Sequence, residues 1–236
     1  MKVLAHRGAS RRAAENTLEA FEIARELGAD GVELDVHASG DQVLVVHHDA
    51  EADGLGVLHD FSVAEITALR PDIPTLETVL ERCAGMLVNV ELKNLPGDAD
   101  FDPNHGIAVL VVELLQDRAA RGASDSVIVS SFNLETIDRV HADDASVPTG
   151  FLTFAGLDPV FALTLAAERG HTALHPQLQA LAGDAPGVVE RAHELGLHVN
   201  VWTVNDPDDV RALRDAGADA VITDVADVAL AALGRR

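Results

Sequence analysis

Short apolar runs, rich in valine, isoleucine and leucine, alternate with longer segments of helical periodicity along nearly the whole chain. Each short run predicts a strand, and we expect nine of them. They are Lys2–Ala5, Gly31–Val36, Val43–His47, Met86–Leu92, Ser126–Ser130, Thr149–Thr153, Thr172–His175, His198–Trp202 and Ala220–Thr223. Because these strands are almost continuously apolar, they are typical of a parallel sheet that is buried on both faces.

The segments between most of these strands repeat apolar residues every three or four positions, as an amphipathic helix does. The predicted helices are Leu18–Leu27, Ile107–Arg121, Leu134–His141, Pro159–Arg169, Val188–Leu195, Asp208–Ala216 and Ala226–Leu233. A further helical segment is expected around Cys83. This alternation of strands and helices predicts an α/β fold.

The third predicted strand differs from the others because the connection leading to it, centred on Ala-Ser-Gly-Asp, is very short. A parallel crossover needs about a dozen residues or more, so Val43–His47 should run antiparallel beside Gly31–Val36 as a hairpin. A turn centred near Gly40 would bring His48 roughly opposite Glu33. The other eight strands predict a (β/α)8 TIM barrel with one extra antiparallel strand after the second barrel strand. An open doubly wound sheet is the alternative, but RGASRRAAEN after the first strand is not a dinucleotide-binding glycine motif.

A chain of 236 residues suits one such barrel, so we expect residues 1–236 to form a single TIM-barrel domain. Its composition is ordinary, with 47% hydrophobic residues, but 17 Lys and Arg stand against 39 Asp and Glu. The net charge of −22 argues against nonspecific nucleic-acid binding and against docking on anionic membranes. It is typical of a solvated acidic surface, and an anionic substrate would need local positive charge or a bound cation.

Cysteine content and the N-terminal sequence indicate the compartment. Cys83 is the only cysteine, so no intramolecular disulfide is expected. The N-terminal sequence MKVLAHRG lacks the layout of a signal peptide, and no apolar run reaches transmembrane length. We therefore expect a cytoplasmic protein without stable membrane insertion.

Polar residues gather at or just past the C-terminal ends of the predicted barrel strands, where TIM barrels build their active sites. They are His6, Asp35, Glu91, Lys93, His175 and Trp202. Although they are far apart in the sequence, we expect them to meet at one mouth of the barrel.

Glu33 and Asp35 lie two positions apart on one strand and therefore point to the same face. Two buried carboxylates repel each other, and a bound cation would relieve this repulsion, with Glu91 as a third oxygen ligand from another strand. Three carboxylates without a matching set of cysteines or histidines favour Mg²⁺ or Ca²⁺ over Zn²⁺. The alternative is an ion-pair network of these carboxylates with Arg7 and Lys93.

Two histidines are predicted beside these carboxylates. Imidazole titrates near neutral pH, so His6 and His48 could flank a reacting group as acid and base. Asp49 could orient His48 or cap the next turn. His47 should face away from the site because side chains alternate along a strand.

Three further side chains could contact a substrate. Arg7 can grip a phosphate through two hydrogen bonds, and Lys93 offers a point charge. Trp202, the only tryptophan, could form a flat apolar wall against the alcohol part of a substrate or pack in the barrel rim. Lys93 is also the only candidate for a Schiff-base aldolase, but the carboxylates expected around it would keep it charged.

Together these motifs resemble the glycerophosphodiester phosphodiesterases, metal-dependent (β/α)8 hydrolases of the phosphatidylinositol phospholipase C-like superfamily. The segments that carry the resemblance span almost the whole chain and are AHRGAS, ENTLEAF, GADGVELDV, VVHHD, IPTLETVLE, VNVELK, SSFN, LHVNVWTVN and GADAVITD. The resemblance implies that the catalytic acid–base pair is His6 and His48. The implied metal ligands are Glu33, Asp35 and Glu91, and the implied substrate and phosphate contacts are Arg7, Lys93 and Trp202.

The resemblance implies metal-dependent hydrolysis of a small-molecule glycerophosphodiester to sn-glycerol 3-phosphate and an alcohol, with Mg²⁺ or Ca²⁺ as cofactor. A lysophospholipase D-like or sphingomyelinase D-like phosphodiesterase is an alternative that needs an apolar rim at the barrel mouth. The short acidic segment AEADGLGVLHD, just after His48 and Asp49, argues against it. A noncatalytic phosphodiester-binding barrel would be expected to lack a catalytic or metal-ligating residue, yet all five are present. The released alcohol and the oligomeric state are left open.

Overall fold

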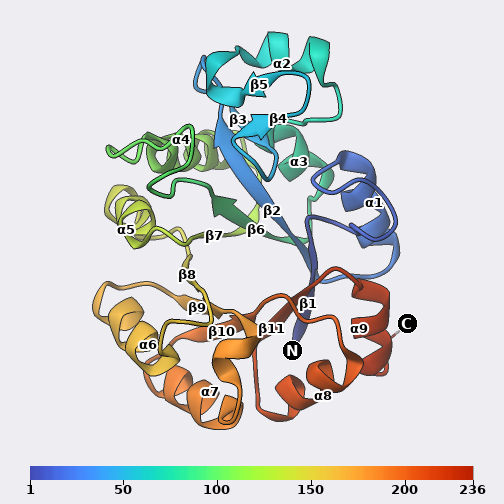
Figure 1. The fold of residues 1–236 in the computed structure, drawn as a ribbon, viewed down its shortest axis with the longest axis vertical. Coiled ribbons are helices and arrows are strands. Elements are labelled where there is room, and N and C mark those ends of the chain that lie inside the picture. The colour runs from blue at the N-terminus through green and yellow to red at the C-terminus, as the bar shows by residue number, and fades with distance from the viewer. Residues whose placement is uncertain (236) are drawn as a thin grey trace.

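The computed structural model, which describes residues 1–235, is built around a closed ring of parallel strands (Figure 1). In this part of the chain, eight strands form the ring: β1 (Lys2–His6), β2 (Gly31–Ala38), β6 (Leu87–Leu92), β7 (Ser126–Ser131), β8 (Thr149–Thr153), β9 (Ala173–Pro176), β10 (His198–Val201) and β11 (Ala220–Thr223). They pair in the order β1-β11-β10-β9-β8-β7-β6-β2, and pairing of β2 with β1 closes the ring. The predicted TIM barrel is therefore confirmed.

The predicted extra strand is β3 (Leu44–Val46), which pairs antiparallel with β2. It joins the far end of β2, beyond the residues that pair with β1, and so lies outside the ring. The register centres the turn one residue later than predicted, on Asp41, because a hydrogen-bonded β-turn starts at Ser39. His48 lies two residues past β3, and continuing this register would bring it beside Leu34, one residue from the approximate position predicted for it.

Helices surround the ring (Figure 1). Those that match the predicted helical segments are α1 (Leu18–Glu26), α3 (Leu76–Arg82), α4 (Gly106–Ala120), α5 (Leu134–Asp143), α6 (Pro159–Glu168), α7 (Ala185–Glu194), α8 (Pro207–Asp215) and α9 (Ala226–Ala232). The largest difference is at α7, which begins three residues before the predicted Val188. The Asp184 side chain accepts a hydrogen bond from the Gly187 N–H there, and a proline occupies the first turn, so both features extend the helix backwards.

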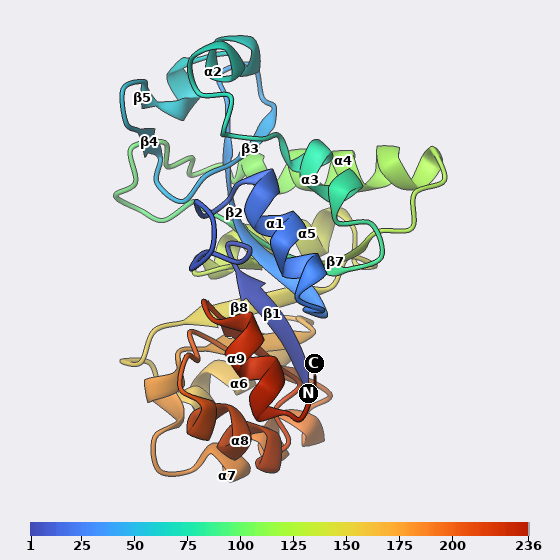
Figure 2. The same cartoon turned by 90° about the vertical axis from the view of Figure 1, so that its right-hand side faces the viewer.

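The chain between β3 and α3 carries elements that the hydrophobic pattern did not predict. They are β4 (Glu51–Ala52), β5 (Gly56–Val57), the 3-10 helix η1 (Leu58–Asp60) and α2 (Val63–Leu69). Each of these elements is too short to show a clear period of hydrophobic residues in the sequence. They nevertheless pack around a small core, in which Leu58 and Ile66 are fully buried beside Val45. This segment projects beyond the ring, at the opposite end of the molecule from α7 and α8 (Figures 1 and 2).

Side chains of the ring strands alternate between two layers. Those that face outward, such as Val32 and Leu34, pack with the helices in the main hydrophobic core. Leu4 and Ile222 belong to a separate, smaller apolar cluster inside the ring. Within residues 1–235, none of the helices combines the length and the apolar character that crossing a membrane requires.

His175 also points into the ring, and its predicted place at the barrel mouth is wrong. Its side chain is completely buried and lies 2.9 Å from the Asn200 amide nitrogen. The neighbouring β8 strand has Gly150 at this level, where any Cβ atom would collide with the imidazole ring. Because Gly150 has no side chain, it leaves space for the His175 imidazole inside the ring, below the mouth of the barrel.

Candidate active site

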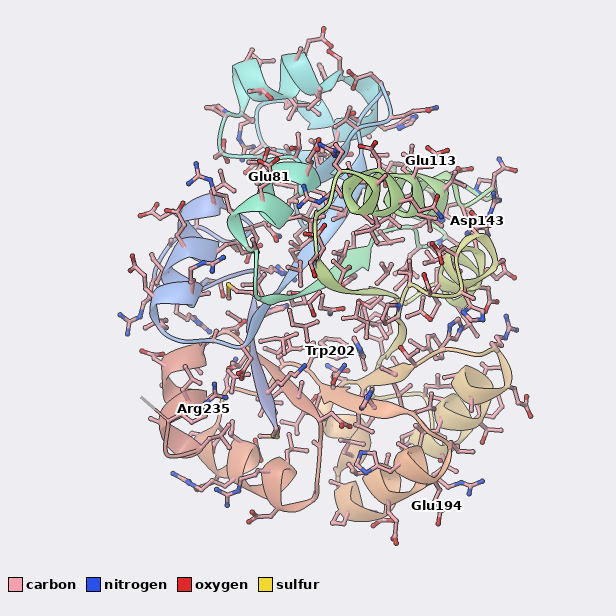
Figure 3. The ribbon with its side chains drawn as sticks, turned by 180° about the vertical axis from the view of Figure 1, so that it is seen from behind. Glu81, Glu113, Asp143, Glu194, Trp202 and Arg235 are labelled. Carbon is pink, nitrogen blue, oxygen red and sulfur yellow. The ribbon has the colours of Figure 1, made fainter. Side chains whose placement is uncertain are left out.

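A cavity of about 430 Å³ opens at the C-terminal end of the ring. Seven of the eight candidate site residues line it, namely His6, Arg7, Glu33, His48, Glu91, Lys93 and Trp202. The eighth, Asp35, is fully buried behind two of these side chains, Arg7 and Lys93. Figure 3 places Trp202 near the middle of the molecule, whereas Glu113 and Glu194 lie at its periphery.

Three carboxylates meet on the inner face of two adjacent strands. Glu33 and Asp35 belong to β2 and Glu91 to β6, and the register of the two strands places Asp35 beside Glu91. All three residues are buried, and each offers an oxygen atom within 4.8 Å of the others. The three side chains are therefore close enough to bind one ion together.

Two cations lie against these carboxylates. Arg7 adopts a left-handed backbone conformation, with φ at 55°, which is uncommon outside glycine. Its backbone N–H donates to Glu33 at 3.2 Å, and its Nε lies 3.0 Å from Asp35. Lys93 Nζ lies 2.8 Å from an Asp35 oxygen and also contacts Glu91. The ion pairs that the sequence offered as an alternative to a metal are thus present in this structure.

The side chains of Arg7 and Lys93 leave Glu33 without an ion pair to either of them. Two cations face three carboxylates, and Arg7 and Lys93 pair through their side chains with Asp35 and Glu91. Although burial opposes ionisation of Asp35, the two cations lower its pKa to about 2. Burial and the Asp35 charge raise the pKa of Glu33 to about 8. The all-oxygen donor set, with Glu33 as a third carboxylate that would lose its proton to bind an ion, fits a hard divalent cation such as Mg²⁺ or Ca²⁺.

His6, at the end of β1, is held by a carboxylate that lies just past the end of the adjacent β11. Its Nδ1 lies 2.6 Å from Asp224 Oδ1, and its Nε2 lies 3.8 Å from Glu33. Asn205 in turn donates to the other Asp224 oxygen at 2.7 Å. Burial opposes a charged imidazole, but the Asp224 hydrogen bond and the Glu33 charge outweigh it and raise the pKa of His6.

His48 reaches the same cavity from the loop after β3. Its Nδ1 lies 2.7 Å from Asp49 Oδ1, an exposed carboxylate. Burial lowers the pKa of His48 because the Asp35 charge compensates only in part. The adjacent His47 does not line the cavity, and its Nδ1 lies 2.8 Å from the Asp49 carbonyl oxygen. His6 and His48 therefore have pKa values displaced in opposite directions.

Aromatic side chains form one wall of the cavity. Phe132 and Phe154 stack with their ring centres 4.1 Å apart, and Trp202 meets both rings edge-on. The indole N–H of Trp202 donates to the His175 carbonyl oxygen at 2.9 Å, which fixes the ring at the rim. Phe154 remains 53% exposed at the mouth. This wall offers a flat apolar surface in the same cavity as the charged groups.

Two residues outside the set of eight candidates support the site. Asp224 follows a strand in GADAVITD, where an aspartate is also an ordinary start for a helix, so only the neighbouring strand reveals its contact with His6. Asn16, in the loop before α1, is buried and donates from its amide to Asp35 at 2.8 Å. The position of Asp224 at a strand end was the one signal that could have indicated it.

Comparisons with a family model, with related sequences and with solved structures all point to the same protein family. The Glycerophosphoryl diester phosphodiesterase family matches the chain over residues 6–228. A glycerophosphodiester phosphodiesterase of Caldanaerobacter subterraneus subsp. tengcongensis is 34% identical over 94% of this chain and 93% of its own length. The solved glycerophosphodiester phosphodiesterase of Thermotoga maritima is 33% identical, with a TM-score of 0.81 over 100% of this chain and 98% of that one. A phosphodiesterase of Oleispira antarctica, solved with its product sn-glycerol-3-phosphate, is 25% identical, with a TM-score of 0.81 over 99% of this chain and 97% of that one.

Proposed function

The chain belongs to the glycerophosphoryl diester phosphodiesterase family, and we propose that it hydrolyses glycerophosphodiesters to sn-glycerol 3-phosphate and an alcohol with the help of a divalent cation. The observation that carries this proposal is a cluster of three buried carboxylates beside one cavity, which His6, His48, Arg7 and Lys93 line. The Oleispira antarctica phosphodiesterase, which has the same fold, was solved with sn-glycerol-3-phosphate, and this supports the product.

We infer that Glu33, Asp35 and Glu91 hold the cation, as Mg²⁺ or Ca²⁺. When bound, such an ion would neutralise the charge on the phosphate oxygens and make the phosphorus more electrophilic. Arg7 and Lys93 line the same cavity and add fixed positive charge there. Their local charge would attract an anionic substrate despite the net charge of −22.

We propose that His6 and His48 transfer the protons. One histidine accepts a proton from the nucleophile, and the other donates a proton to the alkoxide that leaves. By analogy with the related phospholipases C, the nucleophile is a neighbouring hydroxyl of the glycerol, and water then opens the resulting cyclic phosphate. The opposite displacement of the two pKa values supports this pairing, because acid and base partners must differ in protonation state.

The aromatic wall favours a second candidate function. Phe132, Phe154 and Trp202 provide an apolar surface at the mouth, such as a lysophospholipase D-like or sphingomyelinase D-like enzyme would need. For glycerophosphodiester hydrolysis, the same wall would pack against the alcohol group, with Trp202 at the rim.

Products from two substrates offered side by side separate these functions. With glycerophosphocholine and lysophosphatidylcholine at equal concentration, we expect glycerol 3-phosphate to form faster than lysophosphatidic acid. Formation of lysophosphatidic acid alone would replace the proposed substrate with a lipid. Cleavage of neither, by folded protein with Mg²⁺ or Ca²⁺ present, would contradict the proposed function.

A further inference from the structure

A buried histidine that also lines the cavity, but has no part in the proposed chemistry, contacts the backbone of His48. His37 is the next inward-facing residue of β2 after Asp35. Its Nδ1 lies 2.6 Å from an Asp100 oxygen, and both side chains are at least 95% buried. Its Nε2 lies 3.1 Å from the His48 carbonyl oxygen. His37 therefore connects the loop between β6 and α4, which carries Asp100, to the segment that carries His48.

The hydrogen-bond partners of His37 determine the orientation of its ring and which nitrogen donates to His48. A carbonyl oxygen can only accept, so Nε2 must carry a hydrogen and donate it to His48. On the opposite side of the ring, Asp100 fixes the ring orientation through its contact with Nδ1. Carboxylates orient histidines in this way when the other ring nitrogen binds a second partner. Asp100 is itself fixed because its loop is closed by hydrogen bonds between Asn94 and Asp102.

The side chain of His48 is restrained only weakly by its own contacts. It is 38% exposed, and its partner Asp49 is 72% exposed, so this contact restrains the imidazole weakly. His6, in contrast, is bound to Asp224, which Asn205 holds in turn. The orientation of His48 must therefore come mainly from its backbone.

That backbone is held on both sides by β2. The His47 N–H donates to the Asp35 carbonyl oxygen at 3.0 Å, and the His48 carbonyl oxygen accepts from His37. We propose that His37 and Asp100 are positioning residues, which hold the His48 backbone so that its imidazole enters the cavity in a fixed direction. This inference rests on the proposed function, in which His48 transfers a proton.

Two substitutions at one position separate this role from simple packing. Asparagine resembles histidine near Nδ1 and glutamine resembles it near Nε2, so His37→Asn loses the donor to His48 whereas His37→Gln retains one. We expect His37→Asn to lower kcat by about 10- to 100-fold with little change in KM, because a small misplacement of a catalytic group has such an effect. His37→Gln should recover most of the loss. Asp100→Asn, which loosens the ring without removing it, should lower kcat less.

A matched control is His171→Asn. His171 is also a buried histidine paired with an aspartate, Asp138, but it does not line the cavity. We expect this variant to lose thermal stability without losing kcat. If His37→Asn does not yield folded protein, Asp100→Asn and His37→Gln test the same role.

A double-mutant cycle decides the inference. In a His48→Ala background, His37→Asn should cause no further loss of kcat, because its effect acts through His48. A wild-type kcat in His37→Asn, or the same proportional loss with and without His48, would overturn the positioning role. Wild-type turnover by His48→Ala itself would instead contradict the proposed function, so the two failures are distinguishable.

Discussion

His6 and Asp224 lie at the ends of adjacent strands of the ring, and a hydrogen bond of 2.6 Å joins His6 Nδ1 to Asp224 Oδ1. They are 218 positions apart in the chain, so only closure of the barrel brings them together. The contact leaves Nε2 of His6 directed toward the carboxylate cluster, where it lies 3.8 Å from Glu33. The fold thereby presents one defined nitrogen of His6 to the cavity.

Asp224→Asn should change the pH dependence of the reaction. The Asp224 hydrogen bond helps to raise the pKa of His6, so its loss lowers that pKa. The limb of the kcat/KM profile that belongs to His6 should therefore move to lower pH, whether His6 acts as acid or as base. Asp227→Asn is the control, because Asp227 pairs with Arg12 and does not contact His6. An unmoved limb in Asp224→Asn would contradict the contact's role.

Loss of His6 or of His48 should slow turnover strongly. His6→Ala and His48→Ala each remove a proton-transfer group, and we expect kcat to fall by about 100-fold or more. His47→Ala is the matched control, since its side chain lies outside the cavity, and it should keep a kcat close to that of the wild type. Steady-state kinetics on variants with unchanged thermal unfolding would measure this. Near-wild-type turnover by His6→Ala or His48→Ala would contradict the proton-transfer role of the histidine that was replaced.

Cation binding should strengthen as the pH rises toward 8. In the absence of a cation, burial and Asp35 raise the pKa of Glu33 to about 8, so near neutral pH a proton must leave before Glu33 can act as a ligand. The affinity for Ca²⁺ or Mg²⁺ should increase by up to about tenfold per pH unit below 8 and then level off. Titration calorimetry between pH 6 and 9 measures this. Glu91→Gln should weaken binding at every pH, and an affinity that is constant over this range would contradict the ligand role of Glu33.

The barrel could be predicted from the sequence because its signals are local. Apolar runs mark the strands, and the short connection before Val43 excludes a parallel crossover. The strand ends likewise indicated which polar residues would gather at the mouth. Contacts between distant segments gave no such signal, as the pairing of His37 with Asp100 illustrates, since Asp100 lies in a loop without periodicity. The sequence also did not indicate how deep a side chain lies within the ring. The position of His175 depends on the space that Gly150 leaves in the adjacent strand.

His175 should make the protein sensitive to acid. Burial lowers its pKa to about 3 in the folded state, whereas an unfolded histidine has a pKa of about 6.5. Below pH 6.5 the unfolded chain binds a proton that the folded protein does not, so stability is complete above that pH and is lost as the pH falls toward 3. Between pH 7 and 5 this amounts to about 2 kcal/mol.

Urea unfolding of the wild type and His175→Gln at both pH values would isolate this contribution. Glutamine keeps a hydrogen-bonding group near Asn200 but does not titrate in this range. The variant should therefore lose less stability between pH 7 and 5 than the wild type. An identical loss in both proteins would show that His175 does not control acid unfolding.

The most direct test of the central claim is the release of glycerol 3-phosphate from glycerophosphocholine by metal-stripped protein, before and after Mg²⁺ or Ca²⁺ is added back. We expect stripped protein to be inactive and the added cation to restore turnover, because Glu33, Asp35 and Glu91 are proposed to hold an ion that the reaction needs. Full activity after complete removal of metal would contradict this claim and leave the three carboxylates as part of an ion-pair network with Arg7 and Lys93.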